Sequence, residues 1–218
     1  MKSWPILLLF CLLSFLVAAE EKPAADFQEP PLQLSLDDGN KTIPIEIDKP
    51  FQLEPLQAKS PLTLRIKPFR TFMIPGVSFP YQKHYTFKVE DKAECTSWQL
   101  TGTPSLIMLF RFKKSLDQNI MFSAMVAGMM AQYKKENVKS SEATIELGGH
   151  KLSGQMLTIN LAGQTLIQEL YAFTVKETVF IIMIMDKPGK DGQPSEEGVR
   201  QKKLLKEGFR LEEEKKAP

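Results

Sequence analysis

Four apolar-rich segments follow one another between residues 143 and 185, and short turns separate them. Segments of this length, spaced about ten residues apart, are typical of an antiparallel meander. The last of them contains the uninterrupted apolar run Val179–Met185, so we expect it to be the centre of a sheet with both faces covered. The expected strands are 143–147, 151–159, 165–175 and 178–185.

Further strands are expected before this meander. Tyr85, Phe87 and Val89 alternate with polar residues, which favours a half-buried strand. Residues 98–100 and 106–112 flank a Thr-Gly-Thr-Pro turn and predict two more strands.

Two helices are expected. Ser115 is predicted to cap a helix that runs to about Asn137, and apolar residues cover almost its whole circumference, so we expect this helix to be largely buried. A second helix is predicted from Ser195 to about Leu211, with acids in its first turn and a weak apolar stripe. Residues 186–194 are rich in Gly and Pro and are predicted to form a loop. This loop either holds residues that contact a partner or is a plain connector to the last helix.

The N-terminus has the pattern of an export signal. Lys2 precedes an apolar run from Ile6 to Ala19, which is too short for a membrane-spanning helix and ends in small residues. We expect residues 1–19 to be removed and the mature protein to be secreted or periplasmic, with no stable membrane anchor. Residues 20–31 are predicted to be a flexible linker and residues 212–218 a charged tail.

Residues 32–67 predict a small β segment of their own. Leu32, Leu34 and Leu36 alternate with polar residues before an Asp-Asp-Gly-Asn turn, and three isoleucines alternate after it. Pro44 in the second arm lacks a backbone donor and predicts an edge strand. The turn, residues 37–40, has residue types found in calcium loops, but it lacks the spacing of an EF-hand, so a hairpin turn is the better interpretation. Asn40 starts a formal glycosylation sequon whose use the sequence does not decide.

The order of elements from about Phe72 to Leu211 resembles the PsbP-like group, which includes a lumenal photosystem II subunit and the bacterial DcrB-like envelope proteins. The resemblance is carried by the strand ending at Phe112, the turn around 147–154, the strand segment 168–173 and the closing segment 204–210. It implies an α+β fold: an antiparallel sheet with helices packed on both faces, an α/β/α sandwich, at residues 68–211. The N-terminal β-hairpin extension lies outside it. The resemblance also implies a non-catalytic accessory role.

The chain offers few reactive groups. With 28 basic and 26 acidic side chains it lacks the positive excess that nucleic-acid binding needs. Removal of the leader takes Cys11 with it and leaves Cys95 alone. A thiol hydrolase would need Cys95 beside His84 or His150, but the acids around Cys95 oppose thiolate formation. We predict no catalytic residue, no cofactor and no metal site.

Methionines are numerous in and around the first expected helix. Thioethers suit Cu(I), so a copper site is one interpretation. Met121, Met125 and Met129 recur at helical spacing among other apolar residues, which favours core packing instead. The remaining candidates are Met108, Met130, Met156, Met183 and Met185.

Taken together, the sequence predicts an exported, non-enzymatic accessory or binding protein with a protein partner outside the cytoplasm. The alternatives are a small-ligand or copper carrier, and a thiol hydrolase that uses Cys95.

Overall fold

The structure is a computed structural model, and it describes residues 28–37, 41–46, 62–113 and 117–211. The expected signal peptide, most of the expected linker, the turn at 38–40 with Asn40, and the expected charged tail lie outside the described residues.

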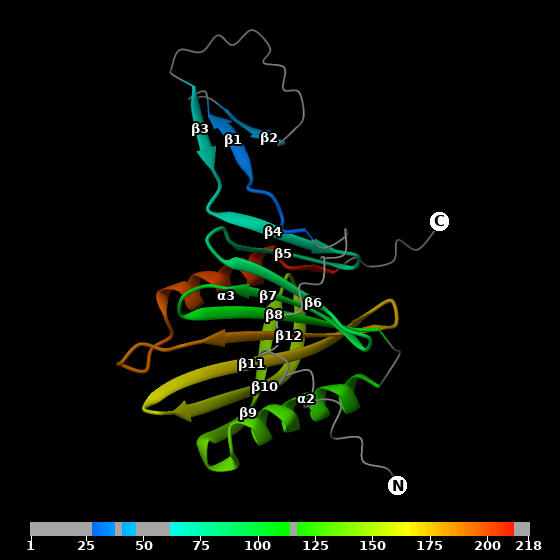
Figure 1. Ribbon diagram of the computed structural model, residues 1–218. Coiled ribbons are helices and arrows are strands. Elements are labelled where there is room, and N and C mark those ends of the chain that lie inside the picture. The colour runs from blue at the N-terminus through cyan, green and yellow to red at the C-terminus, as the bar shows by residue number, and fades with distance from the viewer. Residues whose placement is uncertain (1–27, 38–40, 47–61, 114–116, 212–218) are drawn as a thin grey trace.

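A seven-stranded antiparallel sheet forms the middle of the molecule (Figure 1). Its strand order is β6-β7-β8-β12-β11-β10-β9, so β12 is the central strand, as its apolar run predicts. The meander from β9 to β12 is confirmed, although β9 begins earlier than expected. The strands are β6 (Thr86–Asp91), β7 (Cys95–Thr101), β8 (Ser105–Phe112), β9 (Val138–Leu147), β10 (His150–Leu161), β11 (Gln164–Val175) and β12 (Thr178–Asp186).

Two-residue turns join the four meander strands. Gly148 and Gly149 connect β9 to β10 with positive φ angles of 55° and 86°. Both central residues of a type I′ turn need positive φ, and this turn matches the right-handed twist of the strands it joins. Lys176 and Glu177 adopt the same left-handed region, at 46° and 64°, between β11 and β12 without the help of a glycine.

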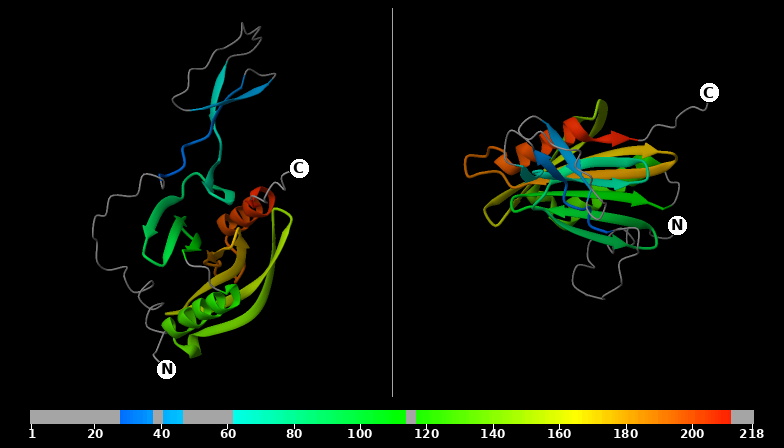
Figure 2. Two further views of the ribbon diagram at one scale, coloured as in Figure 1. Left: turned by 90° about the vertical axis from the view of Figure 1, so that its right-hand side faces the viewer. Right: turned by 90° about the horizontal axis from the view of Figure 1, so that it is seen from above.

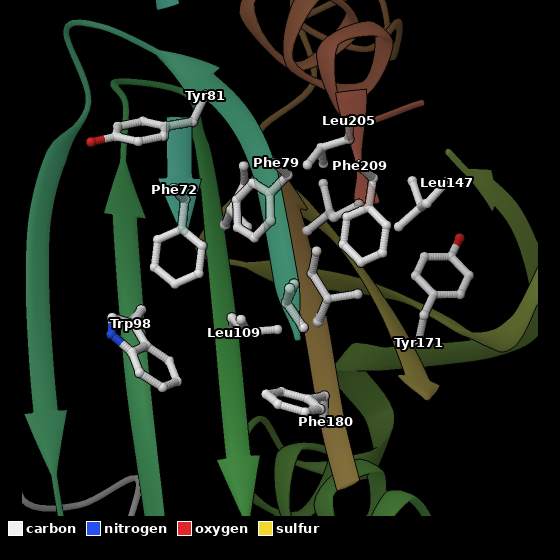
Figure 3. Close-up of a cluster of buried hydrophobic side chains, with 14 of the residues drawn as sticks. Phe72, Phe79, Tyr81, Trp98, Leu109, Leu147, Tyr171, Phe180, Leu205 and Phe209 are labelled. Carbon is white, nitrogen blue, oxygen red and sulfur yellow. The ribbon is translucent and has the colours of Figure 1, made fainter. Parts of the chain in front are cut away.

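A second, three-stranded sheet and helix α3 (Glu196–Gly208) cover one face of the large sheet. This smaller sheet has the order β13-β5-β4, where β4 is Phe69–Ile74, β5 is Val77–Gln82 and β13 is Arg210–Leu211. Aromatic rings fill the layer between, so we call this side of the large sheet the aromatic face (Figure 3). Its buried rings belong to Phe72, Phe79, Tyr81, Tyr85, Trp98, Tyr171, Phe173, Phe180 and Phe209.

Helix α2 (Gln118–Gln132) covers the opposite face. Asp117, not the expected Ser115, is its N-cap, since the Asp117 carboxylate accepts hydrogen bonds from the N–H groups of Asn119 and Ile120. The helix ends five residues earlier than predicted, and a 3-10 turn (η2, Lys135–Asn137) follows Lys134, whose φ is 62°. Only Met125, Val126 and Met129 are fully buried, so the prediction of a largely buried helix is wrong.

Helices do not form both outer layers, so the expected α/β/α sandwich is wrong. The described residues form mainly antiparallel β-sheet, with α2 and α3 as the two α-helices. On the aromatic face, the hairpin β4–β5 covers much of the sheet where a helix was expected. Helix α3 packs against β5 and the edge strand β9. Phe72 and Phe79 of that hairpin stack at 4.8 Å between ring centroids and fill the layer. The weak apolar stripe of α3 fits this arrangement, since Leu205 is buried while Val199 is 55% exposed.

Strands β1 (Leu34–Asp37), β2 (Thr42–Ile45) and β3 (Thr63–Ile66) form a separate sheet, which we call the arm. The arm projects from the body (Figures 1 and 2). The predicted hairpin β1–β2 is confirmed, and Pro44 lies in an edge strand as expected. The sequence did not show that β3 pairs with the other side of β1.

The base of the arm is fixed to β4 by polar contacts. Arg70 forms an ion pair with Glu29 and donates a 3.2 Å hydrogen bond to the Pro30 carbonyl. Gln33 Nε2 donates to Thr71 Oγ1 at 2.7 Å. Among the described residues, no helix is both long enough and apolar enough to cross a membrane.

Candidate functional site

Three segments distant in the sequence bring polar side chains together at one end of the large sheet. The turn between β5 and β6 supplies His84 and Tyr85, β8 begins with Ser105, and the first turn of α3 supplies Glu197. We call His84, Tyr85, Ser105 and Glu197 the Glu197 cluster. Ser195 positions Glu197, because its hydroxyl caps α3 by accepting from the Gly198 N–H at 2.9 Å.

The Glu197 carboxylate is the centre of this cluster. Ser105 Oγ donates to Glu197 Oε1 at 2.8 Å, and His84 Nε2 lies 3.2 Å from Glu197 Oε2. The Tyr85 hydroxyl is hydrogen-bonded to Ser105 Oγ. Gly102 makes room for the carboxylate, because a Cβ atom at this position would lie 1.8 Å from Glu197 Oε1.

Burial and hydrogen bonding have opposite effects on the pKa of Glu197 in this cluster. Burial by itself would raise the pKa of Glu197, but hydrogen bonds from Ser105, His84 and Tyr85 outweigh it, so the pKa is lowered. Burial raises the pKa of Tyr85, whose ring is 2% exposed. Glu197 is therefore a carboxylate and Tyr85 a neutral phenol at neutral pH.

This geometry does not activate a nucleophile. In a hydrolytic triad the imidazole lies between the hydroxyl and the carboxylate and accepts the hydroxyl proton. Here the carboxylate lies between, and Ser105 is only 4% exposed. The cluster instead ties α3 to the ends of β5 and β8, which is a structural role.

Cys95 and the two histidines do not meet. Cys95 is the first residue of β7, 8% exposed, and it donates weakly to the Thr96 carbonyl at 3.5 Å. His84 lies two residues before Thr86, which pairs with Thr101 at the opposite end of β7 from Cys95. At the usual strand rise, this places His84 about 20 Å from Cys95. Three strands separate β7 from His150 on β10, again about 20 Å at the usual strand spacing. The structure therefore places Cys95 far from both histidines.

Seven methionines gather between α2 and the sheet, which we call the methionine face. Met108 lies directly opposite Met183 on the neighbouring strand, and Met185 lies opposite Gln168. Gln168 is 4% exposed; its Nε2 lies 3.4 Å from the Tyr133 hydroxyl, while its Oε1 has no hydrogen-bond partner among the described residues. Met156 and Met73 lie outside this cluster. The seven are Met108, Met121, Met125, Met129, Met130, Met183 and Met185.

Carboxylates and imidazoles do not gather into a metal site in the described ranges, where no group of three or more His, Cys, Asp or Glu side chains is placed to hold an ion. Asp37, at the start of the turn with calcium-loop residue types, forms a 3.0 Å ion pair with Arg65 instead.

Two open grooves accompany these clusters. One, of about 650 Å³, lies beside the N-terminal half of α2 and is lined by Gln118, Phe122 and residues of β9 and β10. The other, of about 530 Å³, lies at the base of the arm, where Leu34, Ile45 and Glu46 line it. The loop expected at residues 186–194 lines neither of these two grooves.

Sequence reasoning missed the Glu197 cluster. Ser105 and Glu197 are 92 positions apart, and His84 and Glu197 are 113 apart, so no local pattern joins them. The arm lies within the small β segment predicted at residues 32–67, and what the sequence did not show is the pairing of β3 with β1.

Comparisons with known proteins do not identify this chain. No family model matches it, and no curated protein matches it. Three solved structures share part of its backbone arrangement. A protein from Bacteroides thetaiotaomicron is 12% identical, with a TM-score of 0.42 over 68% of this chain and 50% of its own length. The chain thus spans half the length of that protein.

LpqN of Mycobacterium tuberculosis, described as involved in cell envelope biogenesis, is 13% identical. Its TM-score is 0.39, over 63% of this chain and 86% of LpqN. PA94 of Pseudomonas aeruginosa, a protein of unknown function and putative regulator, is 11% identical, with a TM-score of 0.27 over 56% of this chain and 85% of its own. Similarities this low assign no activity or partner to the present chain.

Proposed function

We propose that this chain is an exported accessory protein that binds a protein partner outside the cytoplasm and carries out no chemistry itself. The projecting arm supports this proposal most directly. A three-stranded sheet of four-residue strands adds little to the body's core, yet it is held in place by Arg70, Gln33 and Thr71. An element that projects with open strand edges is a common means of recognising extended segments of other proteins.

The reactive side chains support the non-catalytic part of the proposal. Ser105 is buried and donates a hydrogen bond to a carboxylate, and Cys95 is buried about 20 Å from His84 at the usual strand rise. The expected export signal at residues 1–19 supports the extracytoplasmic part of the proposal.

Site-specific photo-cross-linking tests the proposal. A benzophenone amino acid is placed at Thr42 or Thr63, which are exposed on the arm, and the full-length gene is expressed in its native host. We expect a discrete cross-linked species in the extracytoplasmic fraction. We also expect the mass of the mature chain to correspond to a sequence that starts at Glu20. The matched control carries the same group at Asn160, which is exposed at the far end of β10. Equal cross-linking at Asn160, no cross-linking at the arm, or a cytoplasmic chain that retains its leader would each contradict the proposal.

The methionine face favours a second candidate, a carrier of a soft metal ion. Met108, Met183 and Met185 occupy adjacent positions on β8 and β12, and thioethers are the ligands that Cu(I) prefers. The unpaired Oε1 of Gln168 beside Met185 shows that polar bonding in this layer is incomplete.

Competition with a chromophoric Cu(I) chelator under anaerobic conditions tests this candidate. We expect stoichiometric Cu(I) uptake that the double substitution Met183→Leu/Met185→Leu abolishes and that Met156→Leu, outside the cluster, leaves unchanged. Uptake that is absent, or equal in all three proteins, rules the carrier out.

A further inference from the structure

The arm has two edge strands, and their backbones differ. In the strand order β2-β1-β3, β2 and β3 each have one side that pairs with β1 and one side with no strand beside it among the described residues (Figure 1). An open strand edge presents unpaired N–H and C=O groups, to which an extended segment of another chain can add. The capacity of each edge to accept a strand depends on which residues direct these groups outward.

A hydrogen bond to β1 identifies the outward residues of β3. The Lys67 N–H donates to the carbonyl of Gln33, the residue opposite, at 2.9 Å. Backbone groups alternate in direction along a strand, so Arg65 also directs its N–H and C=O toward β1. The N–H and C=O groups of Leu64 and Ile66 therefore point to the open side of β3.

The open side of β2 is blocked by proline. The even-numbered residues of β1 direct their backbone groups toward β2, where Ile43 and Ile45 lie opposite them. Thr42 and Pro44 consequently lie at outward positions, and Pro44 has no N–H to donate. Prolines at a sheet edge discourage strand addition. Since β3 contains no proline, it is the edge of the arm at which a strand can add.

Side chains on the two faces of β3 define the strand that fits beside it. On one face, Leu64 is 59% exposed and Ile66 is 48% exposed. On the other face lie Lys67 and Arg65, and the Arg65 side chain is 63% exposed and 3.0 Å from the carboxylate of Asp37. Opposed residues of neighbouring strands share a face, so apolar residues fit opposite Leu64 and Ile66, and acidic residues fit opposite the two cations.

We propose that the arm binds an extended segment of its protein partner by strand addition to β3, and that this segment alternates apolar and acidic residues. In an antiparallel addition, Leu64 and Ile66 each exchange two backbone hydrogen bonds with the residue opposite. A second copy of this chain fits less well, because the two-fold pairing that opposes Leu64 and Ile66 places Arg65 opposite the same residue of that copy. This inference rests on the proposed function, to which it adds the edge, the pairing residues and the sequence pattern of the partner.

Fluorescence anisotropy with labelled octapeptides tests the sequence pattern. The purified protein is titrated into an alternating Val-Glu peptide, an alternating Val-Lys peptide, and a peptide with a block of valines followed by a block of glutamates. We expect the alternating Val-Glu peptide to bind about tenfold more tightly than either of the others, because it alone matches both faces of β3. Equal affinity for any two of these peptides would contradict the proposed pattern.

Proline substitution tests the edge. Leu64→Pro gives β3 the block that Pro44 gives β2, and we expect the affinity for the alternating Val-Glu peptide to fall about tenfold. Leu64→Ala keeps the N–H and removes only the side chain, so it should lower the affinity less. Thr42→Pro is the matched control at an outward position of β2 and should leave the affinity unchanged. A loss in either control as large as in Leu64→Pro would be incompatible with strand addition to β3.

Amide hydrogen exchange followed by NMR locates the added strand on the backbone. In the free protein we expect rapid exchange at Leu64 and Ile66, and slow exchange at Arg65, whose N–H is directed toward β1. Saturation with the alternating Val-Glu peptide should slow exchange at Leu64 and Ile66 about tenfold. Slow exchange of both in the free monomer would show that the edge is already covered, and slowing that depends on protein concentration would indicate a second copy. Either result overturns the proposal.

Failure of this inference is distinguishable from failure of the proposed function. If a photo-cross-linker at Thr63 captures a host protein but the alternating Val-Glu peptide does not bind, strand addition is wrong and the proposed function stands. If the arm captures no protein and the peptide does not bind, both are wrong.

Discussion

The two faces of the large sheet are built from different chemistry, although the same strands supply both. Along β12, Phe180, Ile182 and Ile184 face the aromatic layer, while Val179, Ile181 and Met183 alternate with them and face α2. The aromatic face is covered by a second sheet and α3, and the methionine face by one helix.

Side-chain geometry explains the difference between the faces. Rings on the aromatic face make defined contacts: Phe173 and Phe180 stack at 5.5 Å between centroids, and Phe173 meets Phe209 edge-on at 5.6 Å. Such pairs contribute about 0.5–1.5 kcal/mol beyond the area they bury, and only in specific orientations. Methionine has three rotatable bonds and fills irregular space. The aromatic face therefore fixes the relative placement of its layers, whereas the methionine face tolerates changes of shape.

Truncation of a central ring is expected to have the largest effect. Phe180→Ala removes a ring that is 1% exposed and leaves a cavity beside Phe173, so the free energy of unfolding should fall by about 3–5 kcal/mol. Urea denaturation followed by circular dichroism measures it. A loss below about 1 kcal/mol would mean that the layer collapses around the cavity, and the contrast between the faces would no longer hold.

The Glu197 cluster anchors α3 over the aromatic face, so its loss should come next. Glu197→Ala leaves the buried hydroxyls of Ser105 and Tyr85 without their carboxylate partner, and we expect a loss of about 1–3 kcal/mol. Glu196→Ala is the matched control, since Glu196 is exposed in the same turn and should change stability by less than about 0.5 kcal/mol. Equal effects in the two variants would assign the loss to helix propensity or the helix dipole rather than to the cluster.

The same carboxylate predicts how the stability depends on pH. The folded-state pKa of Glu197 is lowered, so its contribution is complete above the unfolded-state pKa of about 4.3 and is lost as the pH falls through the folded-state pKa. Glu197→Gln should therefore be less stable than the parent at neutral pH, and the difference should shrink in acid. Denaturation midpoints from pH 7 down to pH 3 measure this, and a difference that stays constant across the range would contradict the assignment.

Local patterns in the sequence predicted elements whose cause is itself local. The apolar run in β12 predicted a central strand, Pro44 predicted an edge, and Ser195 predicted the start of α3, each correctly. The predictions that were wrong concern features that depend on contacts between residues distant in the sequence. Helix α2 looked buried all round because its apolar content is high, yet the sheet beneath it covers only one side, and Ile120 is 69% exposed.

The prediction of the layer order was wrong for a related reason. Nothing in the sequence of the hairpin β4–β5 shows that it packs over Trp98 rather than extending the large sheet. The expectation of helices on both faces came from a family resemblance and not from the residues. The Glu197 cluster depends on this same packing, because it forms only where β5, β8 and α3 converge.

Conservative substitutions at two positions of β12 compare the two faces directly. Met183→Leu replaces one flexible apolar side chain with another of similar volume, so we expect a change below about 1 kcal/mol, whereas Phe180→Leu on the other face should cost clearly more. Parallel urea titrations of the two variants make the comparison. If Met183→Leu is the more destabilising, the methionines are positioned for a purpose that leucine does not meet, which would favour the metal-carrier candidate.

The smallest expected effect is a gain, and it arises at a turn that belongs to neither face. Lys176 and Glu177 both have positive φ, where a side chain strains the backbone, and an Asn-Gly pair is the preferred sequence for such a turn. Lys176→Asn/Glu177→Gly should therefore raise the free energy of unfolding by about 0.5–1 kcal/mol, since the relief of strain exceeds the added freedom of glycine in the unfolded chain. The same pair of residues at the exposed, non-turn positions Lys139 and Ser140 serves as the control and should destabilise β9. Because both faces share the hairpin β11–β12, the gain in the free energy of unfolding should be the same in the Phe180→Leu and Met183→Leu backgrounds. A gain confined to one background would show that this turn is energetically coupled to one layer, so that the contributions of the two faces to stability are not additive with the turn.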